Sequence, residues 1–220
     1  MAFSGFPPSA LTFYEELAAN NTRAWWQANK ARYEGDVRAP MLAMLEELTE
    51  FGPFNVFRPY NDVRFAKNKA PYKLNIAAVG ETEGGASDYV HFSADGLMAG
   101  SGYYHMASDQ LERFRRAVDD DRVGAELESL VRDLESTGCT SSAMEELKTA
   151  PRGYPKDHPR IELLRRKGLI AIRQWPVAKW LHTKAAATRV RDVWLAARPL
   201  DAWLDTHVGP STLPPPEFAR

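Results

Sequence analysis

The sequence contains very little cysteine and no long run of apolar residues. Cys139 is the single cysteine in 220 residues, which excludes an intrachain disulfide and a thiolate metal cluster. No eighteen uncharged apolar residues occur in a row, and the first residues lack the basic and apolar stretches of a signal peptide. We therefore expect a cytoplasmic protein that does not associate with membranes.

The chain also lacks a net charge of either sign. It carries 28 basic and 29 acidic residues, which gives a formal charge of −1 at pH 7. A molecule without a long-range field does not attract nucleic acids or anionic membranes as a whole. The composition therefore argues against a nucleic-acid-binding protein.

The common catalytic and cofactor signatures are missing. The sequence has no Walker loop, no G-x-G-x-x-G after a predicted strand, no G-x-S-x-G elbow and no H-E-x-x-H pair. Its five histidines are too far apart to define a metal site by their spacing, although a composite site of distant residues stays open. The sequence names no cofactor.

Hydrophobic periodicity predicts an α+β fold with a mainly antiparallel sheet and helices in the N-terminal, central and C-terminal parts. We expect a single domain over residues 1–220. Its successive segments are predicted to be helical over 1–52, mainly strands over 54–104, helices plus one strand over 108–175, helical over 176–208, and an extended tail over 209–220.

Several boundaries follow from local signals. Thr22 is predicted to begin a helix, and the pair Asp95-Gly96 to form a hairpin turn. Residues 169–175 predict a strand, a helix is expected from Asp157 through 167, and a last short helix is expected around residues 199–207. Glycines at 100–102 are expected to end the strand before them.

Two segments are strongly basic despite the neutral total. Residues 58–73 hold five basic residues against one acidic residue, and residues 148–173 hold eight against two. If the two segments lie close together, they form a local basic surface that attracts phosphate or carboxylate groups. Alternatively, these cations are solvated or pair with the protein's own carboxylates.

Both basic segments also contain residues that restrict the backbone. Pro71 next to Tyr72 indicates a rigid aromatic turn, and Arg152 lies in a loop with proline and glycine beside Tyr154. Arginine is suited to bidentate recognition of carboxylate or phosphate. We predict a basic pocket for a small phosphate- or carboxylate-bearing ligand, formed by Arg64, Lys69, Tyr72, Lys73, Arg152, Tyr154 and Lys167.

Asp62 and His158 are the candidate acid and base. An acid beside an arginine is usually an ion pair, whereas a histidine near a helix N-terminus and several arginines resists protonation. In an enzyme, Asp62 or His158 would move a proton while the basic residues stabilise developing negative charge. A capping or hydrogen-bonding role would also account for His158. The residues leave open whether the ligand is converted.

Several stretches resemble the mostly bacterial family named domain of unknown function 2461. The matching stretches are 20–30 (NNTRAWWQANK) with Tyr33, 62–73 (DVRFAKNKAPYK), 100–103 (GSGY), 150–154 (APRGY), 157–159 (DHP) and 164–167 (LRRK). The resemblance runs from about residue 5 to about residue 204 and implies membership of a family with no assigned activity. Asn68 departs from the acidic residue that this family often has within the second stretch. If that acid is catalytic in the family, the chain is impaired in that activity.

Two other function classes fit the same residues. The basic surface could dock an acidic protein or a nucleic-acid backbone, or the charges could form a structural ion-pair network without a ligand. Docking would show steep salt dependence without preference among small anions, whereas a pocket would show saturable stabilisation by one ligand. The sequence does not indicate an oligomeric state.

Overall fold

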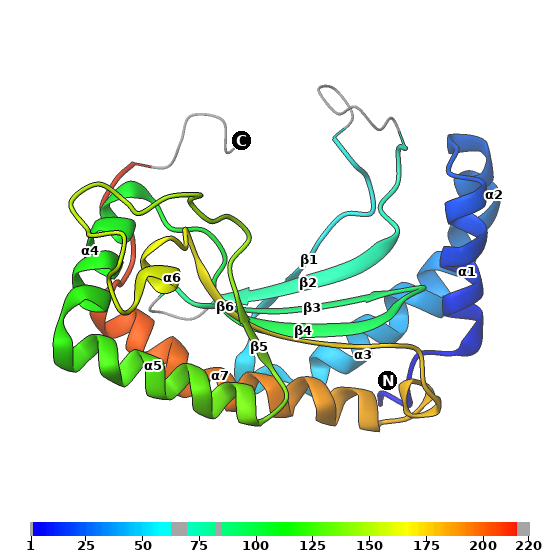
Figure 1. Cartoon of the computed structure of the whole chain (residues 1–220). Coiled ribbons are helices and arrows are strands. Elements are labelled where there is room, and N and C mark those ends of the chain that lie inside the picture. The colour runs from blue at the N-terminus through cyan, green and yellow to red at the C-terminus, as the bar shows by residue number, and fades with distance from the viewer. Residues whose placement is uncertain (1, 63–69, 82–84, 215–220) are drawn as a thin grey trace. The chain divides into compact units, whose positions relative to one another are not determined.

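The structure is a computed structural model, and it describes residues 2–62, 70–81 and 85–214. The fold is α+β, as the sequence predicted, with a six-stranded antiparallel sheet in the order β1-β2-β3-β4-β6-β5 (Figure 1). The strands are β1 (Phe54–Val56), β2 (Asn75–Glu81), β3 (Ser87–Ser93), β4 (Gly96–Tyr103), β5 (Thr140–Ser142) and β6 (Leu169–Trp175).

The helices of the described residues come before, between and after the strands in the chain. They are α1 (Pro8–Ala19), α2 (Arg23–Arg32), the π-helical segment η1 (Tyr33–Arg38), α3 (Ala39–Glu46), α4 (Ser108–Asp119), α5 (Asp121–Ser136), α6 (Ile161–Leu164) and α7 (Ala185–His207). Two short 3-10 helices are η2 (Thr49–Phe51) and η3 (Lys179–His182). Across these residues, no helix is both long enough and apolar enough to cross a membrane.

The chain divides into two compact units, which are described separately. The first unit comprises residues 1–81, 89–99 and 174–192, and the second comprises residues 82–88, 100–173 and 193–220.

In the first unit, α2, η1 and α3 follow one another without a break (Figure 1). The Thr22 hydroxyl accepts a hydrogen bond from the Trp25 amide at 3.3 Å, which confirms the predicted start of α2. Pro40 lies in the first turn of α3, directly after η1, where its missing amide N–H leaves a carbonyl of the preceding turn without a helical donor. The long helical segment that results carries Trp26 and Tyr33 into the core.

Aromatic side chains form much of the core of the first unit. Phe6 stacks on Phe92 with 4.2 Å between the ring centroids, and Phe13 contacts Trp26 and Tyr33 with centroid distances of 6.0 and 5.8 Å. All five side chains are buried. Their burial fixes α1 and the α2–η1 segment against each other.

In the second unit, β5 pairs with β6 in antiparallel register, and α4 and α5 form a helical hairpin (Figure 1). The strand predicted over 169–175 is confirmed as β6. The strand β5 was not predicted, because three residues of Thr and Ser carry no hydrophobic alternation.

Three local expectations were wrong. Strand β4 continues through Gly100 and Gly102. Glycine is needed at both positions, because a Cβ there would collide with backbone oxygens of β6. The helix expected from Asp157 is limited to α6. Pro199, which was expected to lie in a separate short helix, is inside α7.

Two carboxyl groups are buried together in the second unit. Asp88 on β3 is fully buried and Asp201 on α7 is 2% exposed. The Ser101 hydroxyl donates to Asp201 Oδ2 at 2.8 Å and also interacts with Asp88, which accepts from Arg198 at 3.1 Å. One hydroxyl proton cannot satisfy two carboxylates. Burial, opposed by the Ser101 hydrogen bond and reinforced by Asp88, raises the pKa of Asp201 to about 7.

Replacing Asp201 with asparagine should make the chain relatively more stable as the pH rises. The pKa of Asp201 in the folded state lies above the 3.8 of an unperturbed aspartate, so the stability linked to the protonated carboxyl is lost as pH rises from about 4 through about 7. The difference in unfolding free energy between Asp201→Asn and the parent should shift by up to about 1.4 kcal/mol per pH unit in that window. Urea denaturation between pH 5 and 9 measures it. Asp192→Asn, an exposed change on the same helix, is the control, and a pH-independent difference for Asp201→Asn would contradict the prediction.

Candidate functional site

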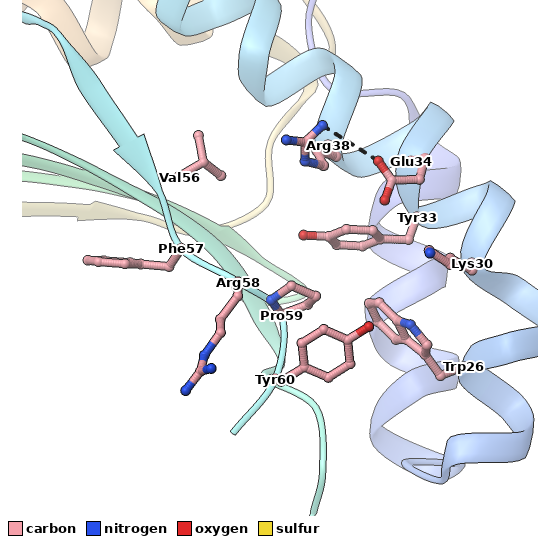
Figure 2. A pocket seen from close by; sticks show the side chains of 10 residues that line it. All are labelled: Trp26, Lys30, Tyr33, Glu34, Arg38, Val56, Phe57, Arg58, Pro59 and Tyr60. Atoms are coloured by element: carbon pink, nitrogen blue, oxygen red, sulfur yellow. Dashed lines mark ion pairs between the residues drawn. The ribbon is translucent and has the colours of Figure 1, made fainter. Parts of the chain in front are cut away.

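A pocket of about 320 Å³ lies in the first unit between the α2–η1 segment and residues 56–60, which end β1 and follow it (Figure 2). Trp26, Lys30 and Arg38 line it from the helical side, and Arg58 and Tyr60 line it from the other side. The pocket therefore combines aromatic walls with cationic groups on two opposite elements.

The aromatic wall is fixed by a stack of two rings. Trp26 and Tyr72 lie nearly parallel, at an interplanar angle of 9° and a centroid distance of 4.2 Å. The Asn21 side chain accepts from the Tyr72 amide at 3.1 Å and donates to the Tyr72 carbonyl at 2.9 Å. Tyr60 forms a β-bridge with Tyr72, and its ring centroid lies 6.2 Å from that of Trp26. These contacts hold the two sides of the pocket at a fixed separation.

Hydrogen-bond donors dominate the pocket lining. The Trp26 indole N–H is buried and has no hydrogen-bond partner in the described part of the chain. Burial is the main cause that raises the pKa of Tyr33 to about 12, so its hydroxyl stays protonated at neutral pH. Glu34 is the one carboxylate among the described lining residues, and it lies 3.7 Å from Arg38. A molecule bound in this pocket would have to supply acceptors.

Tyr72 and Lys73, the predicted ligand residues of the first basic segment that the structure describes, support the pocket without lining it. Tyr72 is 3% exposed and supports Trp26, while the Lys73 ammonium lies 5.3 Å from the centre of the Phe57 ring, which lines the pocket. Asp62 is exposed and has an interaction partner. The predicted ligand residues Arg64 and Lys69 lie outside the described residues.

The predicted residues of the second basic segment belong to the second unit. Lys167 pairs with Glu145 at 2.9 Å, and this hydrogen bond lowers the pKa of Glu145. Tyr154 is partly buried, and burial raises its pKa. Arg152 is exposed, and its side chain forms no hydrogen bond or ion pair within residues 2–62, 70–81 and 85–214.

His158 has a polar neighbour at each of its ring nitrogens. Its Nδ1 accepts from the Arg160 amide at 3.0 Å, which places the proton of the neutral ring on Nε2. That nitrogen lies 3.1 Å from an oxygen of Asp119, at the end of α4. The geometry matches the hydrogen-bonding role that the sequence left open for this histidine, and a catalytic role for His158 or Asp62 stays a prediction.

Arg160 anchors the same loop to the end of α4. Its side chain is buried and donates to the carbonyls of Val118 at 2.6 Å and Asp119 at 3.1 Å. A cation at a helix C-terminus satisfies carbonyls that have no intrahelical donor. Gly124 leaves room for it, since a Cβ there would lie 2.6 Å from Arg160 Nε. Sequence analysis did not single out Arg160, because its partners lie far away in the chain.

Sequence analysis also missed several pocket residues, although a signal for them exists. Trp26, Lys30, Glu34 and Arg38 recur every four residues and therefore share one side of the α2–η1 helical segment. A search for functional side chains along helical faces would have found this series. A count of charge along the chain could not, because acidic residues alternate with the basic ones.

No group of three or more histidine, cysteine, aspartate or glutamate residues suited to a metal ion occurs in the part of the chain that the structure describes. A family model with the description "Conserved hypothetical protein (DUF2461)" matches residues 9–203. The chain therefore belongs to this family, as its motifs implied. No curated protein and no solved structure matches the chain.

Replacing Arg160 with alanine should destabilise the second unit. The change leaves two helix-end carbonyls without their donor, and such losses cost about 2–4 kcal/mol when the group is buried. Chemical denaturation measures the free energy of unfolding. Arg132→Ala, an exposed change on α5, should stay within about 0.5 kcal/mol of the parent. Equal effects of the two changes would show that the anchoring contacts are unimportant.

Proposed function

We propose that this member of the DUF2461 family binds a small anionic ligand, carrying a phosphate or carboxylate group, in the pocket of the first unit. The observation that carries the proposal is the composition of the lining. Cationic and neutral donors surround the pocket, and its one described carboxylate is close to Arg38. Such a lining favours an acceptor-rich anion over a cation or a purely apolar molecule.

The position of the charges supports a ligand inside the pocket. Lys30 and Arg38 extend from the helical side, whereas Arg58 extends from the segment after β1 (Figure 2). Arg58 is exposed and its guanidinium points away from the helix in Figure 2, so Lys30 and Arg38 would supply most of the attraction for an anion in the pocket.

The aromatic side chains favour a ligand with a flat apolar part. Phe57 and Tyr60, which are 36% and 43% exposed, present ring surfaces to a volume of about 320 Å³, at the lower end of the range of small-molecule pockets. Trp26 and Tyr33 are buried and held by packing, so the wall that they form loses little side-chain entropy when a ligand binds. An aromatic or heterocyclic acid or phosphate combines the two features that this lining recognises.

The residues predicted from the sequence enter the proposal in different roles. Tyr72 and Lys73 position the aromatic wall and do not line the pocket themselves. Arg64 and Lys69 are proposed as further contacts for the anion, and Arg152, Tyr154 and Lys167 as anion contacts of the second unit. Asp62 and His158 stay candidates for proton transfer, and the pocket geometry does not require a reaction.

Phenyl phosphate and benzoate should stabilise the protein saturably beyond the effect of sodium chloride at equal ionic strength. Lys30→Ala and Arg58→Ala should each weaken the binding of the better probe by roughly tenfold, because each removes one charge-assisted contact. Calorimetric titration measures the dissociation constant, and circular dichroism checks that each variant is folded.

Lys179→Ala is the matched control, since Lys179 is an exposed cation of the same unit that does not line the pocket. It should leave the dissociation constant unchanged. Equal losses in the control and the pocket variants would overturn the proposal. A response that depends only on ionic strength would also overturn it, and would indicate a docking surface.

A further inference from the structure

A second pocket, of about 250 Å³, lies within the second unit and is lined by cations of the other basic segment. Lys148, Lys156 and Arg165 contribute positive charge to it, and Glu162 contributes the one carboxylate among its described lining residues. The charged lining thus has three positive groups against one negative group.

The cations of this segment differ in whether a carboxylate of the protein lies near them. Arg160, Arg166 and Lys167 each lie within 4.0 Å of a carboxylate of the protein, and none of them lines the pocket. Lys148 and Lys156 line the pocket, and within the described ranges no carboxylate oxygen lies that close to either of them. Two cations without a carboxylate neighbour among the described residues therefore line the pocket, together with Arg165, which is paired with Glu162.

The backbone holds one side of this pocket in place. Residues 145–147 pair with residues 165–167, with hydrogen bonds from the Leu147 amide to the Arg165 carbonyl at 2.8 Å and from the Lys167 amide to the Glu145 carbonyl at 2.9 Å. Lys148 follows directly after this pairing. The backbone of Lys148 is therefore fixed relative to that of Arg165.

The side chain of Arg165 is fixed as well. Its Nε donates to the Leu147 carbonyl at 2.6 Å, and its Nη1 donates to Glu162 at 3.2 Å. Its Nη2 forms no hydrogen bond within the described residues, although the side chain is partly exposed. A guanidinium held by two of its nitrogens offers the third to a ligand at little entropic cost.

The loop that carries Lys156 is anchored at its far end. Turn hydrogen bonds run from the Tyr154 amide to the Pro151 carbonyl at 3.2 Å and from the His158 amide to the Pro155 carbonyl at 3.3 Å. The buried Arg160 then ties the loop to the end of α4. Lys156 thus projects from the second of these two turns.

We infer that this second pocket binds a phosphate group. Three cationic donors reach it from three separate chain positions, which suits a tetrahedral anion with several acceptor oxygens better than a planar carboxylate. The net positive charge of the charged lining matches the charge of a phosphate near neutral pH. The site is independent of the pocket in the first unit, and either can bind its ligand without the other.

Inorganic phosphate tests this inference in a Lys30→Ala/Arg58→Ala background, which removes two anion contacts of the first pocket. Titration at constant ionic strength, followed by calorimetry and by amide NMR shifts, should show saturable binding that perturbs residues 148–165. Adding Lys156→Ala should weaken binding at least fivefold, and Arg132→Ala should leave it unchanged. Glycerol phosphate in place of inorganic phosphate shows whether the site accepts a free ion or a phosphate ester.

Glu162→Gln gives a prediction of opposite sign. It removes the one negative charge of the lining while the Nε bond still holds Arg165, so phosphate should bind roughly threefold more tightly. Weaker or unchanged binding in Glu162→Gln would overturn the inference. Equal effects of Lys156→Ala and Arg132→Ala, or a phosphate response no larger than that of chloride, would also overturn it. Loss of the aromatic-anion response of the parent protein would instead count against the first pocket alone.

Discussion

The stack of Trp26 on Tyr72 is the contact on which the geometry of the first unit's pocket depends. Trp26 belongs to α2, whereas Tyr72 lies just before β2, so the pair joins segments that the chain itself keeps far apart. Asn21 adds two hydrogen bonds to the backbone of Tyr72, which ties the start of α2 to the same place. Because Tyr60 is bridged to Tyr72, the cations on the helix and the cation after β1 face a space of defined width.

Much of the fold could be predicted where a local signal was sufficient. Thr22 supplies its own cap, and β6 is an apolar run of strand length that ends before Pro176. The prediction failed where a distant partner decides the structure. Gly100 and Gly102 were predicted to end a strand, yet they allow the β6 backbone to approach β4 closely. The loop before α6 was predicted to be helical, but its residues His158 and Arg160 instead contact the end of α4.

The candidate sites were predicted less completely than the fold, for a related reason. Counting charges identified the basic segment 148–173 but could not tell that Glu145 neutralises Lys167 while Lys156 has no such neighbour among the described residues. Along the α2–η1 segment, acidic residues alternate with Lys30 and Arg38, so a count shows no excess. Pairing in space, and not abundance in the sequence, decides which cations can meet a ligand.

The π-helical segment η1 rotates the side chains that follow it about the helix axis, relative to those that precede it. A π-helical turn contains one more residue than an α-helical turn, so it shifts the side chains after it by about a third of a revolution relative to those before it. Trp26 precedes this shift, while Met41 and Met44 follow it and are fully buried. If a single residue were deleted from η1, Trp26 could not stay at the pocket while Met41 and Met44 stayed in the core. The π-helical segment is what lets one continuous helical segment line a pocket before it and bury two methionines after it.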